Sequence, residues 1–209
     1  MASLVNEMAG APQRKSQRLS VELFRGFLEG RPDEEHWELI NGVAVMMAPP
    51  TLAHQCIAGN LQRLLHAALE NHAPRLAVLQ RIGVNLAPSV EYYDPEPDIA
   101  VIDSDASEHP GERYANRFYL VAEIVSASDR IDVESKCAVY KLHESCRCIL
   151  VVQQDRCEIR IDMRAPDGWT QQILTAPDGL VDLPEFGLRC KVADLYRGTP
   201  LQPRKTSRP

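Results

Sequence analysis

Apolar side chains recur along the chain with two different periods, one typical of helices and the other of strands. Over residues 51–71 they recur at intervals of three and four, which predicts the longest helix of the chain. The same spacing after the capping hydroxyl of Ser20 predicts a short helix that ends near Gly30. A third helix is predicted over residues 133–144.

Alternation of apolar and polar residues predicts a hairpin and a series of strands. Residues 37–46 alternate on both sides of Asn41-Gly42, the strongest short signal for a two-residue hairpin turn. A polar loop is predicted over residues 103–116, and further strands are predicted at 77–80, 83–86, 99–102, 118–125, 148–153, 158–163, 169–174 and 180–183. This order of elements is typical of an α+β (α/β-like) domain in which helices flank a mixed sheet.

Length and composition predict one domain with two tails. The chain has 209 residues, of which 44% are hydrophobic and 25% charged, as in a single globular domain. We expect this domain to span residues 20–197, with flexible tails at 1–19 and 198–209, the second of them basic. No apolar stretch approaches the roughly 18 to 20 residues that span a bilayer, and no signal peptide is recognisable, so we expect a cytoplasmic protein without a membrane partner.

Charge and motifs exclude several functional classes. The net charge is −6, and because the tails are basic, the body between them is still more acidic. Such a body does not coat nucleic acid, since Lys and Arg dominate nonspecific affinity for phosphate. Nucleic acid would have to meet a local basic patch or the tails, with a metal offsetting the acidic site; otherwise the partner is not nucleic acid. No phosphate-binding loop, dinucleotide fingerprint or CxxC pair is present.

Two acidic residues, Asp98 and Glu123, each lie in an apolar run that is typical of a buried strand. A buried carboxylate is costly unless another charge compensates it. Taken singly, each acid is most simply explained by a solvated strand end or by an ion pair with a buried Lys or Arg. Two of them on neighbouring strands also fit a divalent metal, so both explanations stay open at this point.

Several short motifs, taken together in their order, resemble one family. They are Glu38-Leu39-Ile40-Asn41-Gly42, the Pro-Pro-x-x-x-His-Gln of residues 49–55 with Gly59-Asn60-Leu61, Pro97-Asp98-Ile99-Ala100-Val101, the strand and turn at 121–128, Lys136-x-x-x-Tyr140, and Val192-Ala193-Asp194-Leu195-Tyr196. The resemblance is to the bacterial putative restriction endonuclease family, formerly a domain of unknown function, within the PD-(D/E)XK nuclease superfamily. It covers about residues 20–200 and implies a restriction-endonuclease-like core.

The resemblance also implies a set of site residues. Asp98 and Glu123 would hold Mg²⁺ or Mn²⁺, which prefer oxygen ligands, and the backbone carbonyl of Ile124 would add a third. The superfamily lysine is expected two residues after Glu123, where this chain has Val125. A valine cannot orient water, and Lys136 of the following helix is the substitute that the resemblance implies.

Two further residues and a partner follow from the same resemblance. Glu38 matches an amino-terminal acid that helps to position metal or water, and His54 matches a histidine at the start of the long helix, where it could contact water, phosphate or a carboxylate. The implied substrate is DNA, and proteins of this kind often form homodimers.

Three functional hypotheses therefore remain. The first is a metal-dependent DNA endonuclease with Asp98, Glu123, Lys136, Glu38 and His54 in its site. The second is a catalytically inactive nuclease-fold module that binds or regulates. The third is a structural homodimer whose buried acids are ion-paired.

Overall fold

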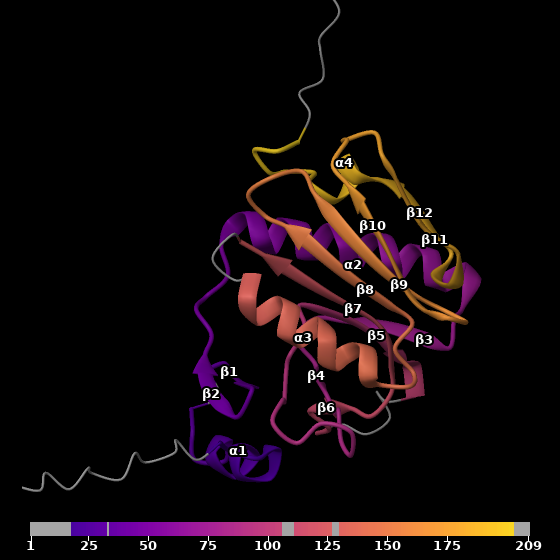
Figure 1. The fold of residues 1–209 in the computed structure, drawn as a ribbon. Helices are drawn as coiled ribbons and strands as arrows, with labels where there is room; N and C mark the ends of the chain where they lie inside the picture. Colours follow the sequence, from indigo (N-terminus) through magenta and orange to yellow (C-terminus); the bar gives the residue numbers. More distant parts are fainter. Residues whose placement is uncertain (1–17, 33, 106–110, 127–129, 203–209) are drawn as a thin grey trace, which may run out of the picture.

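The computed structural model describes residues 18–32, 34–105, 111–126 and 130–202 (Figure 1). Its centre is a six-stranded mixed sheet in the order β10-β9-β8-β7-β5-β3. The bounds of the sheet strands are β3 Leu76–Leu79, β5 Ile99–Asp103, β7 Phe118–Val125, β8 Cys148–Gln153, β9 Ile159–Ala165 and β10 Gly168–Leu174. Strand β7 pairs antiparallel with β5 and parallel with β8, which makes the sheet mixed.

Smaller elements surround this sheet. The helices are α1 Val21–Leu28, α2 Leu52–His72, α3 Arg130–Leu142 and α4 Val192–Leu195, with a 3₁₀ turn η2 at Pro184–Phe186. Three two-stranded ladders complete the fold: β1 Trp37–Ile40 with β2 Val43–Met46, β4 Gly83–Val84 with β6 Tyr114–Ala115, and β11 Leu180–Leu183 with β12 Leu188–Lys191. No helix in the described ranges is long and apolar enough to cross a membrane.

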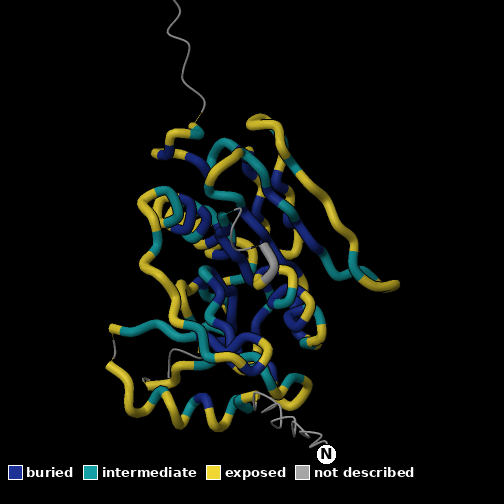
Figure 2. The backbone as a smooth tube through the Cα atoms, turned by 60° about the vertical axis from the view of Figure 1, so that its left-hand side comes forward, coloured by how far each residue is buried: buried dark blue, intermediate teal, exposed yellow. Residues whose placement is uncertain are grey.

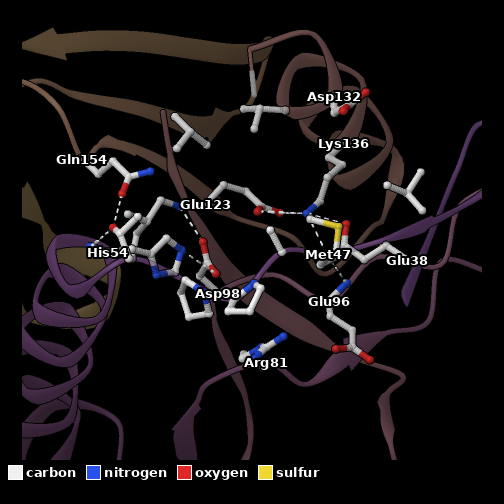
Figure 3. A pocket seen from close by; sticks show the side chains of 18 of the residues that line it. Glu38, Met47, His54, Arg81, Glu96, Asp98, Glu123, Asp132, Lys136 and Gln154 are labelled. Carbon is white, nitrogen blue, oxygen red and sulfur yellow. Dashed lines mark hydrogen bonds and ion pairs between the residues drawn. The ribbon is translucent and has the colours of Figure 1, made fainter. Parts of the chain in front are cut away.

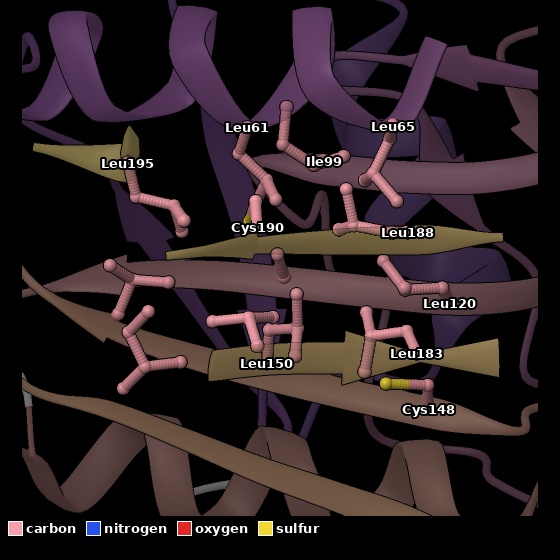
Figure 4. Close-up of a cluster of buried hydrophobic side chains, with 14 of the residues drawn as sticks. Leu61, Leu65, Ile99, Leu120, Cys148, Leu150, Leu183, Leu188, Cys190 and Leu195 are labelled. Atoms are coloured by element: carbon pink, nitrogen blue, oxygen red, sulfur yellow. The ribbon is translucent and has the colours of Figure 1, made fainter. Parts of the chain in front are cut away.

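The two faces of the central sheet bury separate hydrophobic clusters. Figure 2 marks the buried residues along the backbone in dark blue. Because side chains alternate along a strand, Leu120, Ala122 and Ile124 of β7 face α2, whereas Val121 and Val125 face α3. The α2 face is closed further by β11, β12 and α4, and Figure 4 shows their leucines meeting those of α2 and the sheet. By the same alternation, Glu123 points to the α3 face.

The predicted fold class is confirmed, and so are most of the predicted elements. The hairpin turns at Asn41-Gly42, and α2 begins directly after its Thr51 cap. Two predictions are wrong in detail. Residues 103–116 are not wholly a loop, because Tyr114 and Ala115 form β6, and the predicted strand at 83–86 ends at Val84. Most of both predicted tails, residues 1–17 and 203–209, lies outside the described residues.

The β1–β2 hairpin is attached to the domain through Asp94. Leu39 and Asp94 exchange two backbone hydrogen bonds of 3.3 and 3.0 Å, and the Asp94 carboxylate accepts two hydrogen bonds, of 3.0 and 2.8 Å, from the Arg25 guanidinium of α1. These hydrogen bonds join α1, the hairpin and the segment before β5. This attachment holds Glu38, the neighbour of Leu39, in place.

Arg25→Ala is expected to lower the free energy of unfolding by about 2 kcal/mol, because the buried Asp94 carboxylate would lose a bidentate, charge-assisted partner. Thermal unfolding of the two proteins measures the change. Arg31→Ala is the matched control, since Arg31 pairs with the half-exposed Glu35 and its loss should lower the free energy of unfolding much less. Equal losses in both variants would contradict the assigned role of Asp94.

Candidate active site

Asp98 and Glu123 stand opposite each other at one end of the β5–β7 pair. Ile99 of β5 is in register with Ala122 of β7, so the preceding Asp98 reaches the level of Glu123 on the antiparallel partner. The Ile124 N–H donates a 2.7 Å hydrogen bond to Asp98 Oδ2. This bond fixes the Asp98 carboxylate against the backbone next to Glu123. The structure thus brings the two predicted acids together.

Lys136 reaches this end of the sheet from α3 (Figure 3). Its Nζ lies 3.0 Å from Glu123 Oε2 and 2.9 Å from Oε1, and 3.1 and 3.0 Å from the Oε1 and Oε2 atoms of Glu38. Glu38, Glu123 and Lys136 are 3, 5 and 4% exposed. The lysine is therefore a buried cation held between two carboxylates from distant parts of the chain.

Negative charge exceeds positive charge in this cluster. Burial raises the pKa of Glu123 to about 7, and although the Lys136 charge opposes this, the charges of Asp98 and Glu38 add to it. Burial alone would lower the pKa of Lys136, but Glu123 and Glu38 raise it above its ordinary value. Lys136 is thus held protonated, while burial destabilises the ionised form of Glu123 near neutral pH and the charges of Asp98 and Glu38 add to this effect.

Tyr140 adds a neutral donor to the cluster. It lies one helical turn after Lys136, and its hydroxyl donates a 2.7 Å hydrogen bond to Glu123 Oε1. Burial and the nearby carboxylates of Glu123 and Glu38 raise the pKa of this phenol well above its ordinary value, so it remains a donor. Two residues of α3 therefore orient one carboxylate of β7.

His54 contacts Asp98 from the first turn of α2. Its Nε2 lies 3.1 Å from Asp98 Oδ1, and its backbone N–H is capped by the Thr51 hydroxyl at 3.1 Å. Thr51 in turn donates a 2.6 Å hydrogen bond to Gln154, just after β8. Among the described residues, His54 Nδ1 has no hydrogen-bond partner, although it is buried. The Thr51 cap thus helps to position the His54 side chain next to Asp98.

A hydrogen bond between Glu38 and Glu96 joins the hairpin to the segment that leads to Asp98. Glu96 lies two residues before Asp98 along the chain, and its N–H donates a 3.2 Å hydrogen bond to Glu38 Oε1. Burial, reinforced by the Glu38 charge, raises the pKa of Glu96. The segment that leads into β5 therefore joins the hairpin acid to the acid pair of the sheet.

These side chains line a cavity of about 310 Å³ (Figure 3). All five predicted catalytic residues, Glu38, His54, Asp98, Glu123 and Lys136, contribute to its wall, and so do Ile124 and Val125. Sequence reasoning did not identify Thr51, Arg81, Glu96, Asp132 and Gln154, which also line it. Of these, only Glu96 carried a local signal, since it alternates with Asp98 in Pro95-Glu96-Pro97-Asp98.

The donor set fits a hard divalent cation with few protein ligands. Among the described residues, no group of three or more His, Cys, Asp and Glu forms a metal-binding cluster. Mg²⁺, however, commonly takes one or two carboxylates and completes its shell with water and substrate phosphates. Asp98 and Glu123 provide these carboxylates, and the excess negative charge around them favours a cation.

Comparison with known proteins identifies the fold and the family of the chain. Among solved structures, the chain is similar to a protein of Anabaena variabilis ATCC 29413 described as "a putative nuclease belonging to DUF820". The TM-score is 0.65 at 18% identity, over 81% of this chain and 94% of that one, so this likeness concerns the fold. No curated protein matches the chain significantly. A family model described as "Putative restriction endonuclease" matches residues 21–193, and the chain therefore belongs to this family, Uma2.

Proposed function

We propose that the protein is a metal-dependent DNA endonuclease that hydrolyses phosphodiester bonds, with Asp98 and Glu123 holding Mg²⁺ or Mn²⁺. The observation that carries this proposal is the meeting of the two carboxylates with Lys136 in one cavity, in a chain of nuclease fold and family. The backbone carbonyl of Ile124 is proposed as a further ligand. When bound, the cation would lower the pKa of a coordinated water and offset the negative charge that develops on the phosphate.

The chain's own residues would divide the remaining work. Tyr140 and Lys136 hold Glu123 in one orientation, and the Ile124 N–H and His54 hold Asp98. The Lys136 ammonium has three hydrogens and two carboxylate partners, so one N–H can turn to the attacking water. Water oxygen bonds to phosphorus as the P–O3′ bond breaks, and the products are a 5′-phosphate and a 3′-hydroxyl.

A second candidate function rests on a specific observation. Lys136 and Tyr140 already contact both oxygens of Glu123, so the cluster satisfies its charges in part without a metal. This favours the alternative of a nuclease-fold module that binds or regulates without catalysis. The same observation also fits the structural homodimer with ion-paired acids, in which Lys136 would be the ion-pair partner of Glu38 and Glu123.

Purified protein is expected to cleave DNA only when Mg²⁺ or Mn²⁺ is added. The measurement uses double-stranded, single-stranded and branched DNA with either metal, and with EDTA as the metal-free reference. Asp98→Ala should lower the cleavage rate by about 10³-fold or more, because the lost charge stabilisation is several kcal/mol. DNA that stays intact with both metals, in a protein shown to be folded, would refute the endonuclease and favour the inactive module.

A further inference from the structure

Arg81 lies at the edge of the same cavity but takes no part in the cluster of acids. It belongs to the connection between β3 and β4, and Figure 3 shows its side chain near Asp98 and Glu96, away from Lys136. Five acidic side chains line the cavity, Glu38, Glu96, Asp98, Glu123 and Asp132, against two permanent cations, Arg81 and Lys136. Lys136 is buried, and Glu38 and Glu123 balance its charge. Arg81 is therefore the exposed cation of this wall, and its charge is open to an incoming anion.

The Arg81 guanidinium makes no hydrogen bond or ion pair within the part of the chain that the structure describes. Its charge acts on neighbours at longer range: it opposes the rise that burial causes in the pKa of Glu96, and it adds to the fall that burial causes in the pKa of His36. The partly buried Arg25 and Arg160, by contrast, are paired with Asp94 and Asp162. Arg81 is exposed, so the five N–H donors of its guanidinium are open to a ligand at the edge of the cavity.

The backbone of Arg81 holds it in an unfavourable conformation. Its φ is +54°, in the left-handed region that favours glycine and asparagine. The other described non-glycine residue with positive φ is Asn41, which occupies the hairpin turn where asparagine is preferred. An arginine has no such reason to be there. Strained positions of this kind gather at functional sites, where the surroundings impose them.

Contacts on both sides of Arg81 hold the ends of this connection. On one side, Gln80 donates a 2.7 Å hydrogen bond to Gln62 of α2. On the other side, the Gly83 N–H donates a 3.1 Å hydrogen bond to the Arg113 carbonyl, and a side chain at Gly83 would collide with the Tyr114 ring. The connection is therefore clamped between α2 and β6, and the guanidinium is carried on a rigid support.

We propose that Arg81 forms a phosphate-binding subsite and grips two non-bridging oxygens of a DNA phosphodiester at or beside the bond to be cleaved. A guanidinium matches such a pair of oxygens with two parallel hydrogen bonds. Arg81 also supplies the positive charge that an anionic polymer needs beside so acidic a wall. This inference rests on the proposed function, because it takes DNA as the ligand of this cavity.

The test compares Arg81→Asn and Arg81→Lys with a control, Arg63→Ala. Asparagine tolerates positive φ and removes the charge, whereas lysine keeps the charge and loses the paired hydrogen bonds. Arg63 is an exposed arginine of α2 that does not line the cavity. Binding of a fluorescently labelled oligonucleotide is measured by anisotropy with Ca²⁺ over a range of salt concentrations, and cleavage is measured with Mg²⁺.

Arg81→Asn is expected to weaken oligonucleotide binding about tenfold or more. It should also reduce the slope of log Kd against log salt by about one, as expected for the loss of one phosphate contact. Its Tm should stay within about 2 °C of the unchanged chain, since the strained position accepts asparagine. Arg81→Lys should keep the salt slope and lose part of the affinity. Arg63→Ala should change none of these quantities.

The outcomes separate this inference from the proposed function. Binding that depends on Arg81 in a chain that cleaves no DNA would uphold the subsite and refute the nuclease. Cleavage with equal affinity and salt slope in Arg81→Asn and Arg63→Ala would refute the subsite and uphold the nuclease. A chain that neither binds nor cleaves any oligonucleotide would refute both.

Discussion

Lys136→Met is expected to be the most destabilising single substitution in this site, lowering the free energy of unfolding by about 3–5 kcal/mol. The reason is that Glu38 and Glu123 would remain buried without their shared cation. For a domain of this size, the loss corresponds to a fall in Tm of about 10 °C. Thermal unfolding at neutral pH measures it, and DNA cleavage should be lost at the same time.

The pH dependence of this loss has a definite sign. With Lys136, burial and the other acids already raise the pKa of Glu123 to about 7, and removing the cation would raise it further. A carboxyl with a raised folded-state pKa binds more protons folded than unfolded, so it favours the folded state as pH falls. The Tm deficit of Lys136→Met should therefore be smaller at about pH 5 than at about pH 8.

A double variant separates folding from chemistry. Glu38→Gln combined with Lys136→Met removes one of the two unpaired charges, and it should recover part of the lost stability without recovering cleavage. If Lys136→Met unfolded at the same temperature as the unchanged chain, the lysine would not be the buried counter-ion of these acids. If the stabilised double variant cleaved DNA normally, Lys136 would have no role in the reaction.

Features that depend on neighbouring residues could be predicted from the sequence. The Asn41-Gly42 hairpin follows from turn chemistry, and β7 follows from an unbroken apolar run. Asp98 and Glu123 attracted attention because each charge interrupts such a run. In contrast, β6 has only two residues, Tyr114 and Ala115, and its pairing with β4 is what makes it a strand. Such pairing leaves no local pattern to recognise.

The candidate site divides in the same way. Lys136 and Tyr140 are spaced to share a helix face, so their joint approach to Glu123 was accessible from the sequence once the motif was seen. The contact of Lys136 with Glu38 joins residues 98 positions apart, and no local signal encodes it. No local pattern predicts Arg81, because its place in the cavity wall depends on contacts of its neighbours with Gln62 of α2 and with Arg113, just before β6.

Glu123→Gln is expected to abolish cleavage while leaving the fold as stable as before or more stable. The side chains are similar in shape, and the Tyr140 hydroxyl can still donate to the remaining oxygen. Because burial raises the pKa of Glu123 from 4.5 to about 7, its charge costs stability above pH 7; the amide removes that cost, and Glu38 remains as the counter-ion of Lys136. Loss of a metal-holding charge should reduce the cleavage rate by about 10³-fold or more.

The structural and catalytic explanations of Glu123 predict opposite changes in Tm. If the carboxylate were only the ion-pair partner of Lys136, its loss would lower Tm, as breaking a buried pair does. Asp162→Asn is the matched control, since Asp162 is equally buried, lies 2.6 Å from Lys141 Nζ and is not part of the cavity wall. It should lower Tm and leave cleavage intact. A stable, inactive Glu123→Gln beside an unstable, active Asp162→Asn would show that Glu123 is retained for chemistry at a cost in stability.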